Sequence, residues 1–178
     1  MNQTANSSAA LWADFWGPLV TLGVRNNMAS ESIFYEQVGR ATKLAQYLEF
    51  ELSNILLIHE AIEKQLYTAP AKNSDAYLAI RASVDKNTLG ASIRKIKQKL
   101  SIEMDIETVI DTALEARNRF THNFFRDYGL AVHTEEGRDK MSKELTQLCK
   151  SMQKAYDIVS PITSKLFAEH STLLQKHS

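Results

Sequence analysis

The stretch from Ser30 to Tyr67, SESIFYEQVGRATKLAQYLEFELSNILLIHEAIEKQLY, decides the fold of this chain. Its apolar residues recur every three or four positions, a spacing that places their side chains on one face of an α-helix. They are Phe34, Val38, Ala41, Ala45, Leu48, Leu52, Ile55, Leu56, Ile62 and Leu66. Ser30 can cap the start of this helix, which would extend for about 50 Å. The stretch therefore predicts one long amphipathic helix with an apolar face that other helices must cover.

The rest of the chain shows the same three- and four-residue spacing, interrupted by short breaks. Further helices are expected at residues 75–84, from Thr88 to Leu100, at 105–125, and from Thr134 to Leu174. The Asp127-Tyr128-Gly129 sequence should end the third of these helices, and Pro161 should kink or break the last one. Because the chain has only 6 glycines and 3 prolines, the sequence predicts an all-α protein.

Residues 1–30 are expected to form a separate N-terminal arm that is partly disordered at its polar start. Residues 9–23 contain Trp12 and Trp16 before a Gly-Pro pair, so a short helix followed by a turn is predicted there. The two tryptophans require burial, either over their own bundle or in a dimer contact. Residues 31–178 are expected to form an up-and-down bundle of four to five helices.

The composition limits the class of protein. Hydrophobic residues make up 44% and charged residues 24% of the chain, a balance typical of soluble globular proteins. The 21 basic and 21 acidic residues leave a net charge of zero, which argues against nucleic-acid binding through overall charge but allows a local basic surface. No apolar run is long enough to span a membrane, and no signal peptide is visible, so a cytoplasmic protein is expected.

The single cysteine and the five histidines show no metal-binding spacing. Neither a metal nor another cofactor is therefore expected. Cys149 cannot form an intramolecular disulfide, and its helical neighbourhood favours a buried, small apolar side chain over a nucleophile.

The stretch Arg117-Asn118-Arg119-Phe120-Thr121-His122 carries the candidate chemistry. Arginine can hold a phosphate with a planar, always-charged fork, and histidine can move protons near neutral pH. On a straight helix Arg117 and His122 would point about 140° apart, so they can cooperate only if the helix distorts near Thr121 or the arginine curls round. Asn118 and His122 are four apart and share a face, so Asn118 could orient the imidazole by a hydrogen bond.

Basic side chains near this stretch are candidates for RNA binding. They are Arg94, Lys95 and Lys97, expected on the outward face of the helix that begins at Thr88, together with Arg119 and Arg126. The alternative for the basic helix is an ordinary solvated face whose cations complement the helix dipole. Likewise, the Arg–His spacing alone occurs in many helical proteins and would then mark only an exposed helix end.

The context of the motif makes it more specific than its spacing. A long amphipathic helix, a helix opened by Thr88-Leu89-Gly90, the Arg117–His122 motif and a final long helix follow one another. Over residues 31–160 this order resembles the HEPN superfamily, whose hallmark is an arginine separated from a histidine by four to six residues. A polar residue, commonly asparagine, often follows that arginine. The family pattern places its site residues at Arg117, Asn118 and His122.

The resemblance implies a homodimer with facing motifs and a metal-independent endoribonuclease that leaves 2′,3′-cyclic phosphate ends. It also implies a toxin or phage-defence effector, with RNA as substrate and an antitoxin protein as a possible partner. One toxin branch of the family has a tyrosine two residues after the histidine, where this chain has Phe124; Tyr128 is a candidate substitute. Two alternatives stay open: a non-catalytic helical dimer that binds RNA, a nucleotide or a protein, and a small helical regulatory protein.

Overall fold

A computed structural model describes residues 27–66, 75–100 and 102–177. These residues form helices and short connections, without a strand among them, which confirms the all-α prediction. The expected N-terminal arm, with Trp12 and Trp16, lies outside the described residues apart from its last positions.

The helices have the following bounds. They are α2 (Asn27–Glu63), α3 (Asp75–Asp85), α4 (Leu89–Lys99), α5 (Met104–Asn118), the π-helix η3 (Arg119–Asn123), α6 (Phe124–Tyr128), the 3₁₀-helix η4 (Gly129–His133) and α7 (Glu135–His177).

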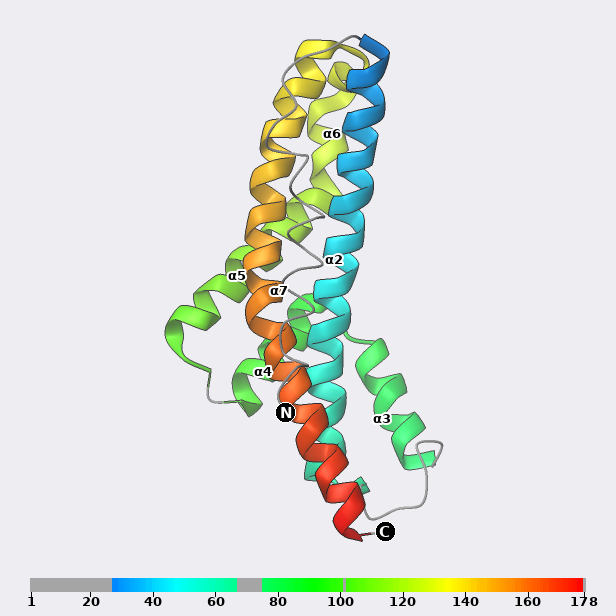
Figure 1. The fold of residues 1–178 in the computed structure, drawn as a ribbon, viewed down its shortest axis with the longest axis vertical. Coiled ribbons are helices and arrows are strands. Elements are labelled where there is room, and N and C mark those ends of the chain that lie inside the picture. Colours follow the sequence, from blue (N-terminus) through cyan, green and yellow to red (C-terminus); the bar gives the residue numbers. More distant parts are fainter. Residues whose placement is uncertain (1–26, 67–74, 101, 178) are drawn as a thin grey trace, which may run out of the picture.

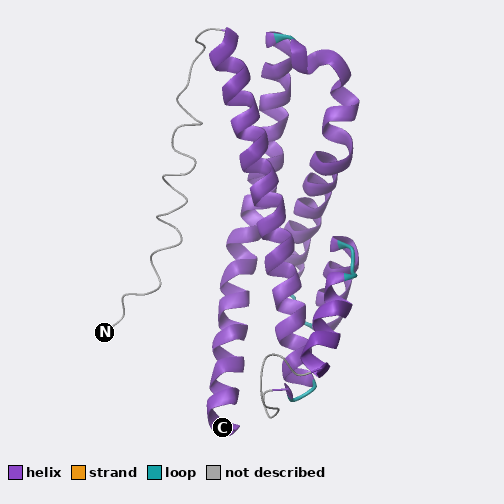
Figure 2. Ribbon diagram, turned by 90° about the vertical axis from the view of Figure 1, so that its right-hand side faces the viewer, coloured by secondary structure: helices purple, strands orange, loops and turns teal. Residues whose placement is uncertain are grey.

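The two long helices, α2 and α7, form the spine of an elongated bundle. Figure 1 shows them side by side along the long axis and running in the same direction, while α5 and α6 run in the opposite direction beside them. Both α3 and α4 contact α2, and α4 also contacts the early part of α5. The view in Figure 2, a quarter turn away, shows the same helical spine with only short loops between the described helices.

The core lies between the apolar faces of α2, α5 and α7. Its largest fully buried side chains are Phe34, Leu48, Leu52, Ile55 and Leu56 of α2, Ile96 of α4, Phe124 of α6, and Met141, Leu145, Met152 and Val159 of α7. Complete burial of one such side chain contributes about 1.5–3 kcal/mol. The apolar face predicted for the long first helix is therefore the surface on which the bundle is built.

Two predicted helix starts are confirmed by threonine caps. The side chain of Thr88 accepts a hydrogen bond from the Ala91 N–H (3.3 Å) at the start of α4. The side chain of Thr134 accepts one from the Gly137 N–H (3.1 Å) at the start of α7. A hydroxyl oxygen in this position satisfies one of the N–H groups that a helix leaves unpaired at its first turn.

Other predicted boundaries are wrong in detail. The helix α2 begins at Asn27, before Ser30, and ends at Glu63 instead of Tyr67. Its end is earlier because Gln65 adopts a left-handed backbone with φ 53°, which an α-helix cannot continue through. Pro161 does not break the last helix, since α7 runs through it without interruption. Pro161 is exposed, so water can hydrate the carbonyl group that its missing N–H would otherwise bond.

Cys149 is buried in the core, as predicted for an apolar side chain. Burial raises the pKa of its thiol to about 12. The thiolate, which is the nucleophilic form, is therefore suppressed at neutral pH.

We expect Gly137→Ala to destabilise the fold by about 1–3 kcal/mol, because the first turn of α7 has no room for a methyl group there. An added Cβ would lie 1.9 Å from the carbonyl oxygen of Ala131 and 2.8 Å from the Thr134 hydroxyl oxygen. Urea unfolding followed by circular dichroism measures the change. Gly39 in α2 is a matched control because a Cβ there meets nothing within 4 Å; Gly39→Ala should stabilise the helix by about 0.5–1 kcal/mol. Equal stabilities of the two variants would contradict this account of the turn.

Candidate active site

The helix is distorted near Thr121, where residues Arg119–Asn123 form a π-helical turn. The carbonyl of Arg119 accepts a hydrogen bond from the N–H of Phe124, five residues on, instead of the four of an α-helix. The Thr121 hydroxyl donates to the Arg117 carbonyl (2.9 Å) at the same turn. A turn that holds an extra residue reduces the angle between side chains five apart. His122 is therefore rotated toward the face that carries Arg117.

Buried phenylalanines and an anchored arginine fix this wide turn in place. Phe120 and Phe124 are both buried, with ring centroids 6.0 Å apart. Arg119, where the turn begins, is tied to α7 through two hydrogen bonds to the Glu144 carboxylate (2.6 and 3.2 Å). The π-helical turn is therefore packed against the core on one side and joined to α7 by an ion pair on another.

Arg117 is half-buried and already has acceptors on both terminal nitrogens. Its Nη2 lies 3.0 Å from Oε2 of Glu49 on α2, and its Nη1 donates to Oδ1 of Asn118 (3.2 Å). Its Nε is buried and has no hydrogen-bond partner among the described residues. The guanidinium is thus held between the end of α5 and the middle of α2.

His122 is exposed, and its imidazole makes no hydrogen bond or ion pair with the described part of the chain. The predicted hydrogen bond between Asn118 and His122 is absent from the described residues, because the Asn118 carbonyl oxygen faces Arg117 instead. His122 is therefore an exposed side chain without a partner in the described part of the chain, whereas Asn118 belongs to the surroundings of Arg117.

Arg119, predicted to bind RNA, has a structural role in this arrangement. Besides Glu144 it contacts the carboxylate of Asp127, so its fork is shared between two acidic residues. The hydrogen bond from Arg119 lowers the pKa of Glu144. The hydrogen bond between Tyr128 and Glu144, assisted by burial, raises the pKa of the tyrosine. Tyr128, the candidate substitute for the family's tyrosine, therefore lies in this network.

The predicted basic face of α4 is mostly paired. Lys97 does not point outward, since its Nζ lies 2.7 Å from both Glu107 and Asp111 of α5. Burial opposes the charged form of Lys97, but the hydrogen bonds that its ammonium group donates to the two carboxylates outweigh this effect and raise the pKa of Lys97. Lys95 donates to the side chain of Asn87 (3.1 Å). Arg94 is exposed and has no ion pair with the described residues.

Arg126 is the most accessible predicted cation beside the π-helical turn. Its side chain is 72% exposed, and its one ion pair within the described residues is a 3.3 Å contact from Nε to Asp127. An exposed ion pair of this kind contributes little and exchanges readily. Arg126 and His122 are therefore exposed polar groups at this turn that a ligand could reach without breaking a buried contact.

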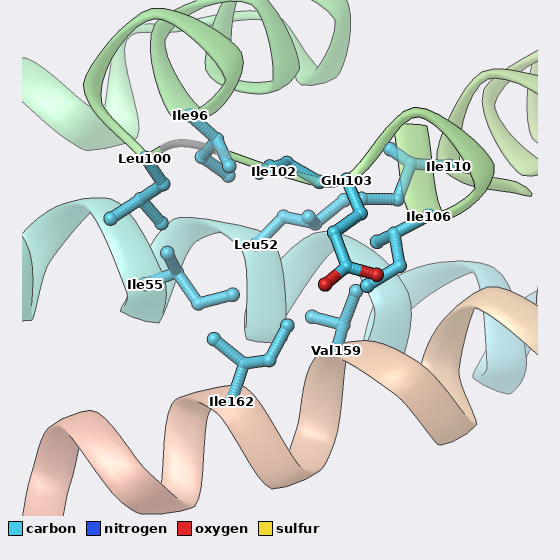
Figure 3. Close-up of a pocket in the computed structure, with 10 residues that line it drawn as sticks. All are labelled: Leu52, Ile55, Ile96, Leu100, Ile102, Glu103, Ile106, Ile110, Val159 and Ile162. Carbon is cyan, nitrogen blue, oxygen red and sulfur yellow. The ribbon is translucent and has the colours of Figure 1, made fainter. Parts of the chain in front are cut away.

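A separate apolar pocket of about 320 Å³ lies at the other end of α5, between α2, α4 and α7. Figure 3 shows its lining: Leu52, Ile55, Ile96, Leu100, Ile102, Glu103, Ile106, Ile110, Val159 and Ile162. None of the predicted site residues lines it. Ile106 precedes Arg117 by about 16 Å along the helix axis, so the pocket and the Arg–His motif are distinct features.

Two acidic residues that matter at this site were missed by the sequence analysis. Glu49 precedes Arg117 by 68 positions and Glu144 follows Arg119 by 25. Each lies on a long helix among other exposed charges, so spacing alone gives no signal for the pairing. At position 49 the sequence offers one hint: the acidic Glu49 directly follows Leu48, a residue of the apolar stripe that is buried in the structure.

We expect Glu144→Gln to remove part of the acid sensitivity of the fold. The folded-state pKa of Glu144 is depressed, so its contribution is present above the ordinary glutamate pKa of about 4.3 and is lost as the pH falls through the lower folded-state value. At pH 7 the variant should be less stable by about 1–2 kcal/mol. Urea unfolding between pH 3 and pH 7 measures both effects, with the exposed Glu31→Gln as control. A parallel pH dependence of variant and wild type would contradict the role assigned to the Arg119–Glu144 pair.

Within the described ranges, no cluster of three or more His, Cys, Asp and Glu side chains is placed to hold a metal ion. No helix in that part of the chain combines the length and apolarity that a membrane crossing requires. Comparisons of the chain with family models, with curated proteins and with solved structures found no match. A function therefore has to be inferred from the geometry around Arg117 and His122.

Proposed function

We propose that the chain is a metal-independent endoribonuclease of the HEPN type, with Arg117 and His122 as its main catalytic residues. The π-helical turn between Arg119 and Phe124 is the observation that carries this proposal. It rotates an exposed imidazole toward a half-buried guanidinium, which a regular helix would keep on another face. Single π-helical turns within α-helices occur often at functional sites.

The two residues would divide the chemistry of RNA cleavage. His122 would take the proton from a ribose 2′-hydroxyl, whose oxygen then attacks the adjacent phosphorus. Arg117 would stabilise the negative charge that develops on the phosphoryl oxygens. A second proton donor would protonate the leaving 5′-oxygen, giving a 2′,3′-cyclic phosphate and a 5′-hydroxyl. DNA would not be cleaved because it lacks the attacking hydroxyl.

A homodimer would complete this site. One chain offers one accessible histidine at the motif, whereas the reaction uses both a proton acceptor and a proton donor. A two-fold axis near the motif would bring a second copy of Arg117 and His122 to the same phosphodiester. A cytoplasmic toxin or phage-defence effector, controlled by an antitoxin protein, is the physiological role that we propose for such an enzyme.

A non-catalytic binding module is the alternative that one observation favours. Both terminal nitrogens of Arg117 already have acceptors, Glu49 and Asn118. An arginine in that state can serve to connect α2 with α5 and need not meet a phosphate. A helical dimer of this kind would bind RNA, a nucleotide or a protein without cutting.

Incubation with structured RNA in EDTA distinguishes the two functions. We expect cleavage by the wild type, with cyclic phosphate ends, and a loss on the order of 100-fold or more for Arg117→Ala and for His122→Ala. An RNA with a 2′-deoxy residue at the cleaved position should remain intact there. Arg81→Ala and His133→Ala are matched controls, since both side chains are exposed and lie outside the motif; these variants should retain activity.

The absence of cleavage by a folded wild-type protein, across several RNAs, would overturn the nuclease and favour the binding module. Cleavage that persists in His122→Ala would assign the proton transfer to another group.

A further inference from the structure

We infer that Glu49 is a positioning residue for Arg117, holding the guanidinium with its free N–H groups turned toward a bound phosphate. The effect that we expect on catalysis rests on the proposed function. The positioning itself concerns only the ion pair between α2 and the end of α5.

Glu49 lies on a closely packed part of α2. Its neighbour Leu48 and the nearby Leu52 are fully buried in the core, so the backbone that carries Glu49 cannot shift without disturbing the contact between α2 and α7. From this helix, Oε2 of Glu49 reaches Nη2 of Arg117 at 3.0 Å. The side chain of Arg117 is 19% exposed and that of Glu49 is 40% exposed.

Two acceptors on different nitrogens fix the plane of the guanidinium. Glu49 accepts from Nη2, and Asn118 accepts from Nη1. One acceptor alone would let the planar group rotate about the shared hydrogen bond, whereas two at separate corners remove that freedom. The polar side chain that directly follows the arginine therefore acts together with Glu49 on the orientation of Arg117 instead of on the imidazole of His122.

The count of hydrogen-bond donors shows that Glu49 does not block the arginine. A guanidinium has five N–H donors: one on Nε and two on each terminal nitrogen. Glu49 and Asn118 each take one, and the Nε donor is buried without a partner. One N–H group is left on each terminal nitrogen, so the guanidinium keeps two donors for the oxygens of a phosphate.

A carboxylate that only competed with the phosphate would behave differently. It would neutralise Arg117 in the free protein, so its removal would strengthen RNA binding. A positioning carboxylate raises the rate of cleavage because it orients the guanidinium of Arg117 before RNA binds. Its removal should therefore lower kcat while KM changes little.

The experiment compares Glu49→Ala, Glu49→Gln and wild type in the EDTA cleavage assay. We expect kcat to fall about tenfold or more in Glu49→Ala, with KM changed less than threefold. Glu49→Gln keeps an acceptor oxygen and should recover most of that loss. Glu36→Ala is the matched control, because Glu36 lies exposed on the same helix and pairs with Arg40. Lower KM values in both Glu49 variants would overturn positioning in favour of competition.

An NMR measurement tests the positioning independently of cleavage. The side-chain N–H signals of Arg117, assigned by their loss in Arg117→Lys, should be sharp in the wild type because rotation of the guanidinium is hindered. They should broaden or disappear in Glu49→Ala and remain in Glu49→Gln. Unchanged Arg117 signals in Glu49→Ala would overturn the inference. A wild type with ordered Arg117 signals but without ribonuclease activity would instead overturn the proposed function.

Discussion

The contact between the apolar faces of α2 and α7 is the constraint on which the rest of the structure depends. Both helices are far longer than the others, and the largest buried side chains of the protein lie mostly on their facing stripes. A face of this size must be covered for the chain to fold. Since α2 and α7 run in the same direction (Figure 1), the segment between them has to return along the bundle, and α5 with α6 makes that return. The candidate site lies on this returning segment.

The returning segment divides its side chains between the core and the neighbouring long helices. Ala113, Ala116, Phe120 and Phe124 are buried, and their spacing of three and four positions is that of one helical face. The π-helical turn lies within this segment, and His122 on that turn is exposed. Two neighbouring arginines have different partners: Arg119 pairs with Glu144 on α7, and Arg117 pairs with Glu49 on α2.

The sequence predicted those features that depend on local periodicity. The apolar stripe of α2, the threonine starts of α4 and α7, and the end of α6 at Gly129, where φ is 52°, follow from spacing and from residues that favour particular backbone geometries. Local rules also indicated that Arg117 and His122 would lie on different faces of a straight helix. They could not indicate which cations are paired. Lys97 reaches Glu107 and Asp111, and Arg117 reaches Glu49, because tertiary packing brings separate helices together. The expected break at Pro161 is absent because α7 continues through it, with Val159 and Thr163 buried on either side.

The charge arrangement limits how an RNA could be recognised. The chain has a net charge of zero, and two of the basic side chains of the motif, Arg117 and Arg119, are bound to acidic partners on the protein itself. Few unpaired cations therefore remain at the motif to displace the counterions of an RNA. General electrostatic attraction would then contribute little to the affinity for RNA. Recognition would then depend on a small number of oriented groups: the free N–H groups of Arg117, the imidazole of His122 and the accessible guanidinium of Arg126. Affinity from a few fixed contacts is sensitive to their orientation, and for that reason the acceptors that hold Arg117 matter as much as the arginine.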